Sequence, residues 1–147
     1  MNKVLIIDDE DQLRGLLSRI IGLEGYEVFQ ADSCKNGLKQ LALHDPDVVL
    51  CDVRLPDGNG VELIAEIKRV KPLVEVIMLT AHGNIPDGVQ AIKNGAFDYL
   101  TKGDDNNRII PLISRAMDQV AKAKQESQAE IPMDREYSFD TILGSSM

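Results

Sequence analysis

The chain alternates short apolar runs with longer stretches in which apolar residues recur every three or four positions. Continuous apolar runs are typical of strands buried on both sides of a sheet, and the wider spacing is typical of helices that cover such a sheet. We expect strands at residues 4–7, 26–31, 48–51, 74–79 and 97–100. Helices are expected at residues 13–23, 34–43, 63–71, 86–93 and 106–128.

The order of these elements predicts five consecutive strand–helix units. Strands that alternate with helices pair in parallel through right-handed crossovers, with helices on both faces of the sheet. The expected fold class is therefore α/β, a doubly wound parallel five-stranded sheet with strand order 2-1-3-4-5. In such a sheet the binding site lies outside the carboxyl ends of the strands, where the strand order reverses.

Chemically reactive residues stand at the ends of these strands. Asp8 and Asp9 follow the first strand, Asp52 ends the third, Thr80 ends the fourth, and Lys102 comes just after the fifth. Because the first and third strands are neighbours in this order, three carboxylates are predicted to share one cleft. Three close carboxylates repel one another, so at least one would be protonated unless a cation lies among them. A few hard oxygen ligands suit Mg²⁺, which also binds phosphate oxygens.

This cluster predicts a magnesium-dependent acceptor of a phosphoryl group. Asp52 is the expected nucleophile, because a carboxylate can attack phosphorus and form an acyl phosphate. Lys102 and the metal would neutralise the phosphoryl oxygens, and Thr80 would donate its hydroxyl to one of them. The main-chain carbonyl of Arg54 could complete the metal sphere, and the small Ala81 would leave room for the phosphate.

A structural alternative is open for each of these residues. Asp9 could cap the first helix, Asp52 and Thr80 could simply close their strands, and Lys102 could be an ordinary surface lysine. Capping explains Asp9 alone. It does not explain why reactive residues coincide with the ends of four strands.

Composition narrows the class of protein further. The 16 Lys and Arg residues and 24 Asp and Glu residues give a net charge of −8, which argues against direct nucleic-acid contact. Cys34 and Cys51 lack the spacing of a metal site, so a disulfide scaffold and a zinc site are both unexpected. No apolar run has the length of a membrane span or of a secretion signal. We expect a cytoplasmic protein without membrane contact.

The strand-end residues, with Pro56-Asp57-Gly58 after the acceptor, resemble the receiver domain of bacterial two-component response regulators. The resemblance spans roughly residues 1–123 and implies a flavodoxin-like (βα)₅ fold that takes phosphate from a sensor histidine kinase. It implies that Asp9 contacts Mg²⁺ directly and that Asp8 acts through water. It also implies that Tyr99 changes rotamer when Thr80 moves toward the phosphate. Without the resemblance, Tyr99 is a half-buried strand aromatic.

One position departs from the family pattern. Receivers usually carry proline after the lysine, with a cis Lys–Pro bond, whereas Gly103 follows Lys102 here. A cis bond to a residue other than proline costs about 2.5–4 kcal/mol, so the sequence leaves the isomer open. Glycine reaches backbone angles closed to other residues, which offers another way to place Lys102.

The C-terminal part predicts a linker and the start of another domain. We expect a receiver at residues 1–123, a helical linker at 124–136 and the first residues of a truncated domain at 137–147. The last segment resembles the opening of the AAA+ ATPase domain of sigma-54-dependent activators, which implies control of that domain by the receiver. In the last helix, Val120 and Ala123 continue the apolar stripe beyond a single receiver, so we expect a homodimer through this helix.

Three other functions remain open at this stage. An aspartyl-phosphate hydrolase would be an enzyme, but Asp52-Val53-Arg54 lacks its second aspartate, so a switch module rather than an enzyme is expected. A flavodoxin-like FMN carrier needs a phosphate-binding loop after the first strand, where this chain has only acids. A protein-binding domain that is never phosphorylated would not need Asp52 and Lys102.

Overall fold

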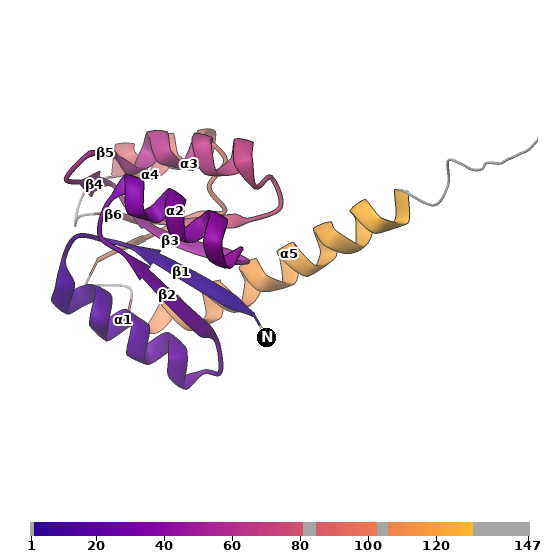
Figure 1. Cartoon of the computed structure of the whole chain (residues 1–147), viewed down its shortest axis with the longest axis horizontal. Helices are drawn as coiled ribbons and strands as arrows, with labels where there is room; N and C mark the ends of the chain where they lie inside the picture. The colour runs from indigo at the N-terminus through magenta and orange to yellow at the C-terminus, as the bar shows by residue number, and fades with distance from the viewer. Residues whose placement is uncertain (1, 81–84, 103–105, 131–147) are drawn as a thin grey trace, which may run out of the picture.

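The computed structural model describes residues 2–80, 85–102 and 106–130. Its main sheet is parallel, in the order β2-β1-β3-β6-β7 (Figure 1). The strands are β1 (Lys3–Ile7), β2 (Glu27–Ala31), β3 (Val48–Asp52), β6 (Glu75–Thr80) and β7 (Asp98–Thr101). Counted within this sheet alone, the order is 2-1-3-4-5. The predicted α/β class, parallel pairing and strand order are therefore confirmed.

Helices cover both faces of the sheet. Among the described residues they are α1 (Asp11–Leu23), α2 (Cys34–His44), α3 (Gly60–Val70), α4 (Ile85–Lys93) and α5 (Ile109–Glu130), with a 3₁₀ turn η1 (Asn106–Arg108) before α5. Leu5 and Ile7 of β1 pack under α2, α3 and α4, whereas Val4 and Ile6 pack against α1 and α5. This alternation explains why the middle of β1, β3 and β6 is a continuous apolar run. None of the described helices combines the length and apolarity needed to cross a bilayer.

The segment after β3 forms more structure than the turn that its composition predicts. Two short strands, β4 (Arg54–Leu55) and β5 (Gly58–Asn59), pair as an antiparallel hairpin. The Asn59 side chain then accepts a hydrogen bond from the backbone N–H of Val61 (2.7 Å), so α3 begins at Gly60, earlier than the apolar spacing predicts.

The start of α1 does not support the capping alternative for Asp9. The N-cap residue is Glu10, and its side chain makes no capping hydrogen bond. The loop between β1 and α1 therefore leaves the side chain of Glu10 free for a contact outside the helix.

The last helix corrects one expectation. Val120 is only 3% exposed and packs in the core with Ile113 and Met117, so it does not extend a free stripe beyond the domain. Beyond it Ala123 is half-buried, and Lys124 Nζ lies 3.0 Å from Asp47 Oδ1. Figure 1 shows α5 running past the edge of the sheet. The tail expected to open a second domain, at residues 137–147, lies outside the described residues.

Candidate functional site

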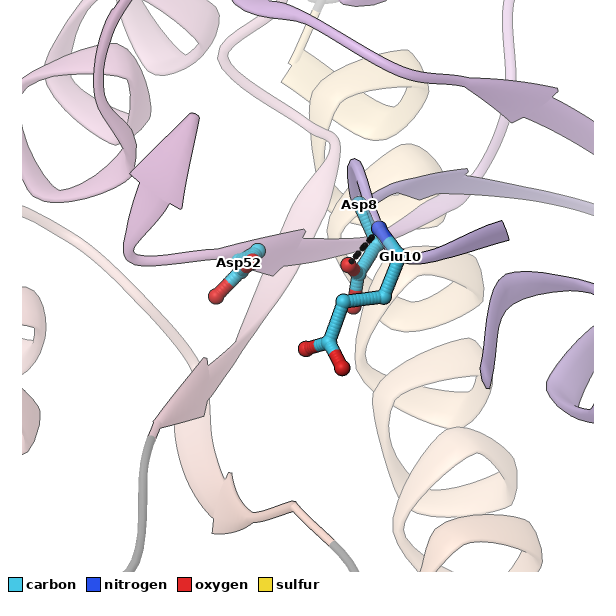
Figure 2. A group of neighbouring side chains, drawn as sticks. All are labelled: Asp8, Glu10 and Asp52. Carbon is cyan, nitrogen blue, oxygen red and sulfur yellow. Dashed lines mark hydrogen bonds between the residues drawn. The ribbon is translucent and has the colours of Figure 1, made fainter. Parts of the chain in front are cut away.

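The parallel register of β1 and β3 brings Asp8 and Asp52 together. Ile7 pairs with Cys51, so the residue that follows each of them lies at the same edge of the sheet. Asp8 is fully buried and Asp52 is 6% exposed. One carboxylate oxygen from each of Asp8, Glu10 and Asp52 lies within 4.8 Å of the others. Figure 2 shows these three side chains meeting at the ends of the two strands.

Lys102 supplies positive charge to this cluster. Its backbone N–H donates to the carbonyl oxygen of Thr80 (2.8 Å), which holds the end of β7 beside β6. Its Nζ lies 2.9 Å from Asp52 Oδ2, 3.1 Å from Asp8 Oδ2 and 2.5 Å from Glu10 Oε1. One ammonium group therefore faces three carboxylates, and negative charge is in excess.

The site perturbs two pKa values in ways that suit phosphoryl transfer. Burial raises the pKa of Asp52 to about 6, although the hydrogen bond from Lys102 opposes the rise. Burial alone would lower the pKa of Lys102, but its hydrogen bonds to Glu10 and Asp52 outweigh burial and hold that pKa above its ordinary value. Lys102 therefore keeps its charge at neutral pH, and Asp52 is mostly ionised above pH 6.

A buried carboxylate oxygen that accepts no hydrogen bond shows where a cation fits. Asp8 Oδ1 accepts the backbone N–H of Glu10 (2.8 Å). Asp8 Oδ2 accepts no hydrogen bond from the described residues, although the Lys102 ammonium lies 3.1 Å away as an ion-pair partner. A buried carboxylate oxygen in that condition is costly, and several hard oxygen donors in one place suit Mg²⁺. The residues present therefore fit a magnesium ion.

The structure adds Glu10 to the acidic cluster, a residue that the sequence analysis did not single out. Asp9, the expected direct ligand, is exposed and is not part of the three-carboxylate group. Glu10 takes part instead, through its ion pair with Lys102. The only signal for Glu10 was its place in the acidic run from Asp8 to Asp11, and the run does not indicate which side chain turns inward. Direct ligation of Mg²⁺ by Asp9 stays a prediction.

The residues expected to act as a switch lie on adjacent strands. Thr80 is 1% exposed, and its hydroxyl donates to the carbonyl oxygen of Leu100 in β7 (3.3 Å). The half-buried Tyr99 ring lies directly against Gly88 in α4, where an added Cβ would come 2.7 Å from the ring. The absence of a side chain at Gly88 thus leaves the space that the ring fills.

The remaining predicted residues flank the acceptor. The backbone N–H of Arg54 acts to lower the pKa of Asp52, and the Arg54 side chain is exposed. Its carbonyl as a metal ligand stays a prediction. A Cβ at Gly60 would lie 1.9 Å from the Asp52 carbonyl oxygen, so α3 starts in direct contact with the acceptor strand. Ala81 and Gly103 lie outside the described residues.

A comparison of the sequence with models of protein families shows which family carries this set of strand-end residues. The family model described as response regulator receiver domain matches residues 4–114, a span that contains Asp8, Asp52, Thr80 and Lys102. The chain belongs to this receiver family. The resemblance drawn from the strand-end residues is thereby confirmed, and the receiver forms the larger part of the chain.

Individual relatives agree with this assignment. The receiver is 39% identical over 132 residues to the transcriptional regulatory protein GlrR of Escherichia coli (strain K12), an alignment that covers 90% of this chain and 30% of that protein. The solved receiver domain of NtrX from Brucella abortus is 33% identical with a TM-score of 0.75, covering 78% of this chain and 98% of that one. The solved beryllofluoride-activated NtrC4 receiver domain dimer is 35% identical with a TM-score of 0.76, covering 82% and 99%. The chain thus spans about 30% of the length of its curated relative GlrR.

Proposed function

We propose that this receiver is the phosphorylation-dependent switch of a two-component system. It takes a phosphoryl group from a sensor histidine kinase onto Asp52, with Mg²⁺ bound. The observation that carries this proposal is the position of the Asp52 carboxylate, 2.9 Å from the Lys102 ammonium and beside the buried Asp8 Oδ2, which accepts no hydrogen bond. A nucleophile, a fixed cation and an oxygen that needs a metal lie together at one edge of the sheet.

The proposed step is an in-line displacement at phosphorus. An Asp52 oxygen forms a bond to phosphorus while the bond from phosphorus to the donor breaks, and the donor leaves with that electron pair. Lys102 keeps its ammonium group against the phosphoryl oxygens. Bound Mg²⁺ supplies further neutralisation of those oxygens. Its proposed ligands are Asp52, Asp9, Asp8 through water, and the main-chain carbonyl of Arg54.

Thr80 and Tyr99 are proposed to transmit the phosphorylated state to the face formed by α4, β7 and α5. The Thr80 hydroxyl is engaged with Leu100, so it must leave this partner in order to reach a phosphoryl oxygen. Its departure opens space beside β7 for a change of the Tyr99 rotamer. Two arrangements of one packed element are sufficient for a switch. The receiver promotes only its own phosphorylation and dephosphorylation and turns over no separate substrate.

The output is proposed to be a sigma-54-dependent transcription-activating AAA+ domain of the same protein, in the cytoplasm. Residues 124–136 are the proposed linker, and residues 137–147 the proposed start of that domain. The name of the similar NtrC4 structure describes a receiver dimer. That description supports a homodimer here through the exposed part of α5 beyond Val120. DNA contact belongs to other parts of the protein.

Intact-mass spectrometry tests the proposed function directly. The chain is incubated with acetyl phosphate and Mg²⁺, and its mass should rise by one phosphoryl group. Asp52→Asn or removal of Mg²⁺ by a chelator should abolish the increase. Asp47→Asn, at the opposite end of β3, is the matched control and should label like the wild type. Undiminished labelling of Asp52→Asn would exclude Asp52 as the acceptor.

A further inference from the structure

The Lys102 ammonium already uses all of its hydrogen-bonding capacity in the unphosphorylated receiver. It carries three N–H groups, and its hydrogen-bond partners are the carboxylates of Asp8, Glu10 and Asp52. In the proposed reaction Lys102 must also contact an oxygen of the incoming phosphoryl group. One of the three carboxylates therefore has to lose its hydrogen bond to Lys102.

The surroundings of the three carboxylates indicate which one leaves. Asp8 is fully buried and is held by the backbone N–H of Glu10, and Asp52 is the residue that receives the phosphoryl group. The Glu10 side chain is 59% exposed, stands on the loop before α1, and makes no capping bond to that helix. It can turn into solvent without leaving a buried charge unpaired.

We infer that Glu10 holds Lys102 in the unphosphorylated receiver and yields it to the phosphoryl group, so that the Glu10 carboxylate slows formation of the phosphoaspartate. This inference rests on the proposed function of Asp52. Glu10 is a positioning residue, since it acts through Lys102. Its negative charge also repels an anionic donor, and both effects act before the phosphorus–oxygen bond to Asp52 forms.

Glu10 should affect the formation of the phosphoaspartate but not its decay. Before transfer, Glu10 competes for Lys102. After transfer it has turned away, and it no longer affects the hydrolysis of the product. Removal of its charge should therefore speed phosphorylation and leave the lifetime of the phosphoaspartate unchanged. The expected gain in rate is about two- to fivefold, the factor that corresponds to a partly exposed ion pair.

The test compares the full chain with Glu10→Gln and with Asp11→Asn as the matched control. Asp11→Asn removes one charge from the next residue, the first of α1, but Asp11 pairs with Arg14 rather than with Lys102. Initial rates of labelling by acetyl phosphate with Mg²⁺ are measured by intact mass. The transfer joins an Asp52 oxygen to phosphorus, breaks the bond from phosphorus to the acetate oxygen, and releases acetate with that electron pair. The lifetime is measured after removal of the donor, and Mg²⁺ affinity by isothermal titration calorimetry.

The inference expects faster labelling in Glu10→Gln than in both the wild type and Asp11→Asn. It also expects a lifetime within about twofold of the wild type and a Mg²⁺ affinity that matches Asp11→Asn. Equal labelling rates in the two variants would overturn it, as would a lifetime shortened in proportion to the gain in rate. Slower labelling with a large loss of Mg²⁺ affinity would also overturn it and make Glu10 a metal ligand. A wild type that takes no label would instead contradict the proposed function.

Discussion

The central strand β3 has an aspartate–lysine pair at each of its ends. Asp47 stands before the strand, with its Oδ1 3.0 Å from Lys124 Nζ. Asp52 closes the strand, with its Oδ2 2.9 Å from Lys102 Nζ. Similar distances and the same residue types thus occur at opposite edges of one sheet.

The two pairs differ in charge balance and in exposure. Asp47 has a lysine of its own, and its Oδ2 also accepts the backbone N–H of Lys3 (3.0 Å). The Lys124 side chain is 52% exposed, against 16% for Lys102. At the other end, Asp52 shares one lysine with two further carboxylates. An aspartate–lysine pair is therefore a structural link where its two charges balance and its lysine is exposed. It is a reactive site where both side chains are largely buried and negative charge is in excess.

The largest expected difference between the two ends of β3 is in the rate of phosphorylation after each lysine is removed. Lys102→Ala should lower the initial rate of phosphorylation by acetyl phosphate about a hundredfold or more, because a fixed donor to the phosphoryl oxygens is lost. Lys124→Ala should leave that rate within about twofold, because an exposed ion pair contributes little. Intact mass measured over time supplies both rates. Equal rates in the two variants would mean that the Asp52 end has no special chemistry.

Substitution of aspartates at the two ends of β3 should change the affinity for Mg²⁺ by different factors, and this difference should be smaller than the difference in rate. Asp8→Ala should weaken Mg²⁺ binding about tenfold, as for a residue that acts through water, and Asp9→Ala should weaken it more. Asp47→Ala should have no effect. Isothermal titration calorimetry gives the order. Equal losses in Asp8→Ala and Asp9→Ala would contradict direct ligation by Asp9.

A third expected effect concerns the free energy of unfolding and has opposite signs at the two ends. Asp52 has a pKa of about 6 in the fold and an ordinary value of 3.8. Its folded form therefore binds the proton more tightly. Its stabilising contribution is complete below pH 3.8 and is lost as the pH rises through about 6. An asparagine side chain does not ionise, so Asp52→Asn should be more stable than the wild type at pH 8 by about 1–3 kcal/mol in metal-free buffer.

The matched variant Asp47→Asn should be less stable than the wild type at pH 8. It weakens an ion pair and a hydrogen bond, which together contribute about 0.5–1 kcal/mol. Urea unfolding at pH 8 and pH 4 measures both variants. The advantage of Asp52→Asn should shrink toward pH 4. A destabilised Asp52→Asn at pH 8 would show that Lys102 already compensates the buried charge in full.

The sequence predicts the sheet well because local pattern and tertiary environment coincide there. β1 from Val4 to Ile7 and β3 from Val48 to Cys51 are continuously apolar and buried, and a strand covered on both faces requires that composition. The predicted site residues Asp8, Asp52 and Lys102 come together for a related reason. The order of the strands alone brings the ends of parallel strands to one edge of the sheet.

The features that the sequence missed depend on contacts between distant segments. Glu10 meets Lys102, which lies far along the chain, and no local rule distinguishes it from the exposed Asp9. Helical spacing places Val120 on the apolar stripe of α5, but it does not show how far along the helix the domain covers that stripe. The hairpin of β4 and β5 is too short to show an alternating pattern.

The contact between Gly60 and the Asp52 carbonyl has a consequence for mutational scanning. Every substitution at position 60 adds a Cβ, and at 1.9 Å from a backbone oxygen none can be accommodated without moving the acceptor strand or α3. A scan scored by signalling output would therefore rank Gly60 with Asp52, although glycine has no side chain with which to act. Scoring the same library for protein abundance would separate them, because replacement of Gly60 depletes the folded protein and Asp52→Asn does not.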